Sequence, residues 1–273
     1  MPQTTGADGN TLNYEDTGGT ARPVVLIHGW PLNLNSWADQ VEPLTAAGHR
    51  VITYDRRGFG SSEPSARYDY DALAADLAVL LDALDLHDAT LVGFSMGGGE
   101  VVRYIAHHGE DRLHSVVLAA AIPPYLLKSA ANPDGPLTET AAQDMQTQLA
   151  ADREGFLEGF LRTFYSAWGE LLVTDEQLQS TLAMTHEADS EAALACMESF
   201  ATTDFRAELE KITVPTLIVH GDSDGIVPVE GSGRRTHRAI PHSELSIIHG
   251  GPHGLNASHA REFNAALLEF LGR

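Results

Sequence analysis

Short apolar runs alternate with helix-like segments along most of this 273-residue chain. The runs are rich in Val, Ile and Leu, a composition typical of strands that are buried on both faces of a sheet. The clearest predicted strands cover residues 23–28, 50–55, 90–94, 115–120, 214–220 and 244–249, and helical patterns lie between or after them at 70–84, 97–108 and 257–271. This alternation predicts a parallel sheet wrapped by helices.

The alternation stops between about residues 123 and 210. This segment opens with Pro123-Pro124, contains no convincing strand pattern and continues as consecutive helical stretches until regular alternation resumes at Ile212. A helical insertion between two strands of one sheet is typical of a lid rather than of a separately folding domain. We therefore expect a core formed by residues 1–122 and 211–273 and a helical lid formed by residues 123–210.

Charge and composition exclude several classes of protein. The net charge is −21, and Lys128 and Lys211 are the only lysines, so the chain lacks the basic face that nucleic acids or anionic membranes require. No apolar run approaches the ~20 residues of a membrane span. The N-terminus has no basic start followed by an apolar stretch, so a cytoplasmic protein is expected. Cys196 is the only cysteine, which excludes an internal disulfide and disfavours a zinc–thiolate site.

One serine lies between two glycines directly after a predicted strand, in Gly93-Phe94-Ser95-Met96-Gly97. A serine hydroxyl is a poor nucleophile unless it is exposed, aimed and paired with a base. A sharp turn from strand to helix exposes the hydroxyl, and flanking glycines allow that turn without a side-chain clash. The pattern therefore predicts a nucleophilic serine, provided that an acid and a base lie elsewhere in the chain.

Candidates for the acid and the base follow two later strands. Asp222 and Asp224 come directly after the strand that ends at His220, and His253 follows the next strand in Gly251-Pro252-His253-Gly254. Loops after parallel strands share the edge of the sheet at which ligands bind. Asp222 competes with Asp224 for the role of the acid, and Asp55, at the end of another strand, is a third candidate.

Five segments in this order carry a resemblance to a known family. They are His28-Gly29-Trp30-Pro31, Tyr54-Asp55-Arg56-Arg57-Gly58-Phe59-Gly60-Ser61-Ser62, Gly93-Phe94-Ser95-Met96-Gly97-Gly98, His220-Gly221-Asp222-Ser223-Asp224 and Gly251-Pro252-His253-Gly254. With them the chain resembles α/β-hydrolase-fold serine enzymes over nearly its whole length, and more narrowly the bacterial cofactor-free haloperoxidase, perhydrolase and aryl esterase group. The resemblance implies an α/β-hydrolase fold, with a mostly parallel central sheet flanked by helices and a helical lid inserted between strands.

The resemblance also implies roles for individual residues. Ser95 would attack the acyl carbon, His253 would act as base and then as acid, and Asp224 rather than Asp222 would orient His253. The backbone N–H groups of Trp30 and Met96 would hold the oxyanion.

The implied activity is hydrolysis of small carboxylic esters or acids through an acyl-enzyme. Perhydrolysis accompanies it: hydrogen peroxide replaces water and releases a peracid, which oxidises halide indirectly. The partners are thus a small ester or carboxylic acid and water or hydrogen peroxide, with no cofactor and no metal.

Pro31 bears on the choice between water and peroxide. Proline has no N–H and biases the preceding residue toward extended geometry, so Pro31 restricts Trp30, whose carbonyl is expected beside the oxyanion hole. In the group that this sequence resembles, a proline after this tryptophan accompanies peroxide use. We therefore expect perhydrolysis.

Apolar residues near the catalytic segments are the expected substrate contacts: Trp30, Pro31, Ile122, Phe156, Phe160 and Ile226. Phe156, Phe160 and Phe164 recur at i, i+4 and i+8 on one face of a lid helix. Such a stripe more often packs inside a lid than lines a pocket, but above an active site it contributes to both.

Other interpretations stay open at this stage. His28, His220 and His249 also end strands, but no pair of them has local ligand spacing, so a metal site is not expected. An amidase, a lactamase or a carbon–carbon bond hydrolase would use the same triad. A low-turnover ligand receptor of this fold usually lacks a triad member or an oxyanion element, and this sequence keeps all of them. A homo-oligomer is compatible with the resemblance, although no symmetric contact can be identified in the sequence.

Overall fold

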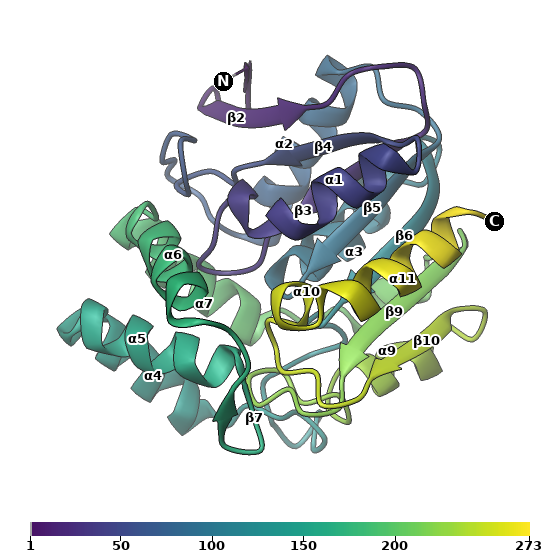
Figure 1. Cartoon of the computed structure of the whole chain (residues 1–273). Helices are drawn as coiled ribbons and strands as arrows, with labels where there is room; N and C mark the ends of the chain where they lie inside the picture. The colour runs from purple at the N-terminus through teal and green to yellow at the C-terminus, as the bar shows by residue number, and fades with distance from the viewer. Residues whose placement is uncertain (1) are drawn as a thin grey trace.

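An eight-stranded sheet forms the centre of the molecule in the computed structural model, which describes residues 2–273 (Figure 1). Met1, the first residue of the predicted core, lies outside the described residues. The strand order is β1-β2-β4-β3-β5-β6-β9-β10. The pairs β1–β2 and β2–β4 are antiparallel, and the later pairs are parallel. The strands are β1 Gln3–Thr5, β2 Thr11–Asp16, β3 Pro23–Ile27, β4 Arg50–Tyr54, β5 Ala89–Phe94, β6 Leu113–Ala119, β9 Thr216–Gly221 and β10 Glu244–Ile248.

Helices cover both faces of this sheet, which is why β3, β5 and β9 are buried at every position. In Figure 1, α1 and α11 lie in front of the sheet, and α2 and α3 lie behind it. The front layer consists of η1 Leu34–Trp37, α1 Ala38–Ala46, α10 Leu255–Ser258 and α11 Ala260–Leu271. The back layer consists of α2 Tyr70–Ala83, α3 Met96–His108, α8 Arg206–Leu209 and α9 Gly233–Ala239.

A helical insert joins β6 to β9 and lies beside one end of the sheet, in teal and green in Figure 1. It consists of α4 Glu139–Ala151, α5 Arg153–Phe164, α6 Asp175–His186 and α7 Ser190–Thr202. Between α5 and α6 runs a small antiparallel ribbon of β7 Ser166–Ala167 and β8 Glu170–Leu171. The expectation that this stretch holds no strand is therefore wrong in detail, because strands of two residues are too short to produce an alternating pattern.

The predicted α/β-hydrolase architecture is confirmed, and the six predicted strands are β3, β4, β5, β6, β9 and β10 with ends shifted by one or two residues. The sequence pattern did not indicate β1 and β2. β1 is a short edge strand, and β2, which pairs with β1 and β4, buries little more than Leu12 and Asn13 between polar neighbours. The helix predicted over 257–271 is divided, because His259 leaves the helical region with φ −124° and ψ 41°.

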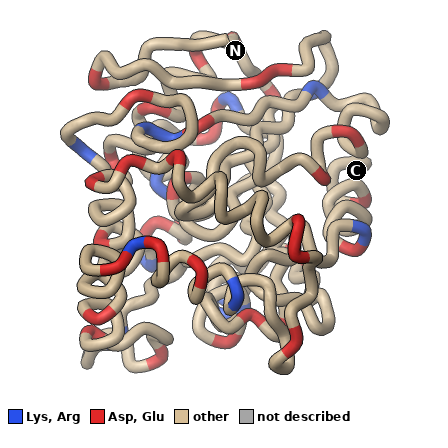
Figure 2. Tube along the Cα trace, turned by 60° about the vertical axis from the view of Figure 1, so that its left-hand side comes forward, with Lys and Arg blue, Asp and Glu red and all other residues tan. Residues whose placement is uncertain are grey.

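Acidic residues are distributed over the whole trace, whereas lysine and arginine are few (Figure 2). Within residues 2–273, no helix combines the length and the apolar character needed to cross a membrane.

Candidate active site

Ser95 lies in the turn between β5 and α3 with φ 54° and ψ −118°, a backbone conformation that residues other than glycine rarely adopt. A Cβ atom on Gly93 would come within 2.5 Å of the Gly97 carbonyl oxygen. A Cβ atom on Gly97 would come within 2.6 Å of the Ile27 carbonyl oxygen. Both positions therefore require glycine, and the tight turn presents Ser95 at the carboxyl end of β5.

A continuous chain of hydrogen bonds links Ser95 to His253 and His253 to Asp224. The Ser95 Oγ lies 2.8 Å from His253 Nε2, and His253 Nδ1 lies 2.7 Å from Asp224 Oδ2. Since the carboxylate can only accept, Nδ1 carries the proton and Nε2 is left to accept the hydroxyl proton of Ser95. Each of the three residues is at most 6 % exposed.

Asp224 is held by more than its bond to the histidine. Its Oδ1 accepts hydrogen bonds from the backbone N–H of Ile226 at 2.9 Å and of Val227 at 2.7 Å. His220 Nε2 lies 3.3 Å from its other oxygen. Burial alone would raise the pKa of Asp224, but the neighbouring His253 and the hydrogen bonds from His220 and His253 hold this pKa well below its usual range. The carboxylate is therefore ionised throughout the neutral range.

Asp222 does not reach His253 and instead binds the loop after β10. Its Oδ2 lies 2.7 Å from His249 Nδ1, and its Oδ1 accepts from the Gly250 N–H at 2.7 Å. The side chain of His249 is 85 % exposed. This pair braces two neighbouring loops at the surface and has no contact with Ser95.

Asp55, the third candidate for the acid, forms hydrogen bonds with groups other than His253. Its oxygens accept from the backbone N–H of Leu34 and Ser61 and from the side-chain amide of Asn13. Asp55 thus ties the loops after β3 and β4 to β2.

The two residues whose backbone N–H groups are expected to hold an oxyanion, Trp30 and Met96, both belong to segments that adjoin Ser95. A Cβ atom on Gly29 would lie 3.1 Å from the Ser95 Cβ, so the loop that carries Trp30 packs against the serine turn. Met96 begins α3, where a helix has free N–H groups. Within residues 2–273, neither the Trp30 N–H nor the Met96 N–H donates to a backbone or side-chain acceptor.

A buried ion pair, which the sequence pattern did not indicate, supports the loop that carries Trp30. Arg56 Nε lies 3.0 Å from Glu100 Oε2, and Arg56 Nη2 donates to the His28 carbonyl at 2.8 Å. The Arg56 N–H donates to His28 Nε2, and His28 Nδ1 donates to the Gly29 carbonyl. Burial and the nearby Arg56 charge lower the pKa of His28 well below its usual range, so this imidazole is neutral.

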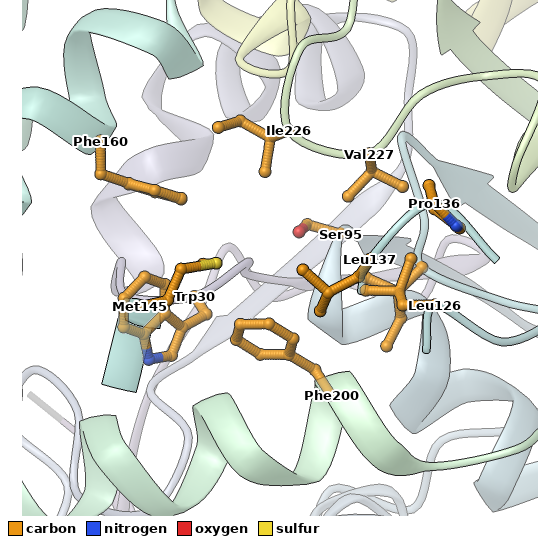
Figure 3. Close-up of a pocket in the computed structure, with 11 residues that line it drawn as sticks. Trp30, Ser95, Leu126, Pro136, Leu137, Met145, Phe160, Phe200, Ile226 and Val227 are labelled. Atoms are coloured by element: carbon orange, nitrogen blue, oxygen red, sulfur yellow. The ribbon is translucent and has the colours of Figure 1, made fainter. Parts of the chain in front are cut away.

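A cavity of about 70 Å³ opens beside Ser95 (Figure 3). Of the predicted contacts, Trp30, Ile122, Phe160 and Ile226 lie on its wall. Figure 3 shows the Ser95 hydroxyl pointing into the space between Trp30, Phe160 and Ile226. The other wall residues were not predicted: Leu126, Pro136, Leu137, Met145, Phe200 and Val227. Most of them belong to the insert, far along the chain from the catalytic segments, whereas Val227 lies three residues after Asp224 and could have been proposed as Ile226 was.

Two predicted contacts lie elsewhere. Pro31 is buried after a cis Trp30–Pro31 peptide bond and is not part of the wall. Phe156 lines a neighbouring cavity rather than the one beside Ser95.

The three phenylalanines of α5 are divided between the two expected roles. Phe160 packs edge-on against Trp30 with ring centroids 5.2 Å apart and also lines the cavity. Phe164 is fully buried and packs edge-on against the His253 ring at 5.0 Å. A backbone hydrogen bond joins the same two segments, because the Gly254 N–H donates to the Phe164 carbonyl at 2.8 Å. The insert therefore contacts the loop of His253 directly.

No group of three or more His, Cys, Asp or Glu side chains within residues 2–273 is arranged to hold a metal ion. Cys196 is fully buried, and burial raises the pKa of its thiol to about 12. The thiol therefore stays protonated and is not a nucleophile.

Comparison with known proteins gives a consistent result. Residues 22–260 match the family model of the alpha/beta hydrolase fold. A non-heme chloroperoxidase from Kitasatospora aureofaciens is 42% identical over 100% of both chains, and a bifunctional esterase/perhydrolase from Acinetobacter calcoaceticus is 34% identical over 99% of both. The crystal structure of a bromoperoxidase from Bacillus anthracis superposes with a TM-score of 0.95 at 48% identity and covers 100% of both chains.

Proposed function

Because the chain belongs to the α/β-hydrolase fold family, as a serine hydrolase of the non-heme haloperoxidase and esterase/perhydrolase type, we propose that Ser95 forms an acyl-enzyme with small carboxylic esters or acids. The acyl group is then transferred to water or to hydrogen peroxide. The observation that carries this proposal is the hydrogen-bond chain from Ser95 through His253 to Asp224, with both steps at or below 2.8 Å.

In the first half of the proposed reaction, Ser95 Oγ attacks the acyl carbon while its proton passes to His253 Nε2. The negative charge on the former carbonyl oxygen is held by the N–H groups of Trp30 and Met96. Loss of one such donor typically costs about 3–4 kcal/mol of transition-state stabilisation. The carbon–oxygen bond to the leaving group then breaks, and His253 returns the proton to that oxygen.

In the second half, water or hydrogen peroxide attacks the acyl-enzyme and gives up a proton to His253. Ser95 leaves and takes the proton back. Water yields the carboxylic acid, and peroxide yields the peracid. The peracid oxidises a halide ion to hypohalous acid outside the site and is itself reduced to the acid, so the protein needs no redox group of its own for this step.

Substitution of Ser95 tests the proposal. Ser95→Ala is expected to lower both p-nitrophenyl acetate hydrolysis and bromide-dependent monochlorodimedone halogenation by at least about 10³-fold, because the covalent route is lost. An unchanged melting temperature would show that the variant is folded. Survival of both activities in the folded variant would contradict the mechanism.

The choice of peroxide over water is tested at Pro31. We expect Pro31→Leu to lower peracid formation from acetate and peroxide roughly tenfold, which corresponds to about 1.4 kcal/mol, while ester hydrolysis changes less. The exposed Pro64 allows Pro64→Leu as a matched control. Equal peracid rates in the wild type and in Pro31→Leu would remove the argument for Pro31.

The division into a core of residues 1–122 and 211–273 and a lid of residues 123–210 is part of this proposal. It is supported by Phe160 of α5 and Phe200 of α7, which bring side chains of the insert to the wall beside Ser95. A cytoplasmic location and a homo-oligomeric state are further expectations. Light scattering on the purified chain measures the oligomeric state directly.

A further inference from the structure

Asp224 has a second histidine neighbour besides His253. His220 lies near the end of β9, and its side chain and that of Asp224 are both 0 % exposed. The His220 Nε2 atom lies 2.8 Å from the Val227 carbonyl oxygen and 3.3 Å from Asp224 Oδ2. The same Oδ2 atom accepts the hydrogen bond from His253 Nδ1 at 2.7 Å. One carboxylate oxygen therefore faces two imidazole rings, and the proposed reaction uses only the His253 ring.

The groups around His220 fix which of its nitrogen atoms carries the proton. A carbonyl oxygen can only accept, so Nε2 must donate to Val227. Within residues 2–273, Nδ1 is buried and has no hydrogen-bond partner. A second proton on Nδ1 would be a buried donor without an acceptor, which is unfavourable. His220 therefore fits this position as a ring with a single N–H, which points at the Val227 carbonyl and the Asp224 carboxylate.

Helix α9 holds the His220 ring in this position. A Cβ atom on Gly233, the first residue of α9, would come within 2.7 Å of His220 Nδ1. Unbonded heavy atoms pack well only at larger separations, so glycine leaves the space that the ring occupies. The ring cannot move toward α9 without displacing that helix. Packing therefore keeps Nε2 directed at Asp224.

The segment after Asp224 is bound to both members of the His220–Asp224 pair. The Val227 N–H donates to Asp224 Oδ1 at 2.7 Å, and the Val227 carbonyl accepts from His220. The Ile226 N–H donates to the same Oδ1 at 2.9 Å. The side chains of Ile226 and Val227 lie on the wall of the cavity beside Ser95 (Figure 3). One N–H of His220 thus contacts both the acid and the segment that forms part of this wall.

From this geometry we propose that His220 is a positioning residue for the reaction at Ser95: its Nε2–H keeps Asp224 Oδ2 in line with His253 Nδ1. The inference rests on the proposed acyl-enzyme reaction and adds to it a residue that acts through Asp224 rather than on the reacting atoms. Without this N–H, Asp224 Oδ2 faces one donor instead of two, so its orientation toward His253 is less well defined.

His220→Phe tests the proposal, because it keeps a ring of similar size and removes the N–H. The rate at which a fluorophosphonate modifies Ser95, followed by intact mass, measures the reactivity of this serine directly. We expect His220→Phe to lower this rate and kcat for p-nitrophenyl acetate by about tenfold and to leave KM within about twofold. His220→Gln, whose amide supplies an N–H of similar reach, should restore the rate to within about threefold of the wild type.

A double-mutant cycle with Asp224→Asn determines whether His220 acts through the acid. If it does, His220→Phe should change the Ser95 phosphonylation rate by less than about twofold in the Asp224→Asn background, because the group that it positions has already lost its function. A role in general stability would lower the rate equally in both backgrounds. An equal loss would therefore overturn the inference, and so would a folded His220→Phe variant with the wild-type rate.

The matched control is His249→Phe, which makes the same substitution in the neighbouring pair with Asp222. The side chain of His249 is 85 % exposed and bonds to Asp222. His249→Phe should leave the phosphonylation rate of Ser95 within about twofold of the wild type. A loss as large as that of His220→Phe would show that the effect is not specific to the histidine beside Asp224.

Gly233→Ala gives a second route to the same group if His220→Phe does not fold. It displaces the His220 ring without removing a polar atom, and alanine is more favourable than glycine in a helix. We expect the Ser95 phosphonylation rate to fall by about threefold in the wild-type background and by less than about twofold in Asp224→Asn. No loss in either background, or the same loss in both, would count against His220.

Failure of this inference is distinguishable from failure of the proposed function. If Ser95 of the wild type is not phosphonylated, or if p-nitrophenyl acetate hydrolysis survives Ser95→Ala, the acyl-enzyme mechanism itself is wrong. If Ser95 reacts as expected but its rate does not depend on His220, the mechanism stands and His220 only fills space in the core.

Discussion

Asp224–His253 and Asp222–His249 are two aspartate–histidine pairs formed by the same two loops, those that follow β9 and β10. In both pairs an Asp Oδ2 lies 2.7 Å from a His Nδ1. In both, an aromatic ring of the insert packs against the histidine: Phe164 lies 5.0 Å from His253, and Trp168 lies 5.5 Å from His249.

The pairs differ in their surroundings. The side chains of Asp224 and His253 are 0 % and 1 % exposed, whereas those of Asp222 and His249 are 33 % and 85 % exposed. Trp168 is itself 72 % exposed. His253 has Ser95 on its other ring nitrogen, whereas within residues 2–273 the only hydrogen-bond partner of the His249 ring is Asp222. An Asp–His hydrogen bond occurs in both pairs, so this bond alone does not make the histidine a catalytic base. Catalysis also requires a nucleophile within reach and an environment that excludes water.

The largest effect is expected from removing the charge of each acid in turn. Asp224→Asn should lower kcat for p-nitrophenyl acetate by about 10⁴-fold, because the amide no longer holds His253 in the tautomer that accepts the Ser95 proton. Asp222→Asn should leave kcat within about twofold. Similar losses in the two variants would show that burial does not distinguish the pairs.

A smaller effect is expected from the rings that cover the two histidines. Phe164→Ala should lower the free energy of unfolding by about 3–5 kcal/mol, since it removes a fully buried ring from the contact between α5 and the His253 loop. Trp168→Ala should change it by less than about 0.5 kcal/mol, because the ring is mostly exposed. Urea unfolding of both variants measures the difference. A greater loss in Trp168→Ala would contradict the assignment of the insert's contact to Phe164.

The smallest effect concerns the dependence of stability on pH. The pKa of Asp224 is lowered on folding, so the stability that its carboxylate contributes is present above the ordinary pKa of aspartate and is lost as the pH falls below about 5. The difference in melting temperature between the wild type and Asp224→Asn should therefore shrink from pH 6 to pH 3. The corresponding difference for Asp222→Asn should stay small, because solvent screens that pair. A difference for Asp224→Asn that grows toward low pH would show that this carboxylate is not ionised in the folded state.

Much of the fold could be predicted because its strands are buried on both faces. Such strands appear as unbroken Val, Ile and Leu runs, as in β3 and β5, and each is bounded by turn residues. The antiparallel strand β2 was not predicted, because only Leu12 and Asn13 of this strand are buried and most of its other residues are polar. The β7–β8 ribbon was not predicted because strands of two residues have no periodicity.

The residues of the candidate site also fall into a predictable and an unpredictable group. Residues adjacent in sequence to a strand end, such as Ser95 and His253, could be proposed from local motifs. Met145 and Phe200 could not, because they lie on insert helices whose positions over Ser95 depend on long-range packing. The buried Glu100 was also missed, since only the fold shows that a charged side chain in α3 meets Arg56.

The sequence by itself determined the α/β architecture, the serine turn and the order of nucleophile, acid and base, because each depends on local backbone geometry or on residues that end a strand. Only the tertiary structure showed how differently Asp222 and Asp224 are buried and which phenylalanine of α5 faces the cavity beside Ser95. These outcomes depend on contacts between segments far apart along the chain, 29 residues for Asp224–His253 and 158 residues for Ser95–His253. Burial is likewise a property of the packed molecule, since it differs sharply between two aspartates with one residue between them.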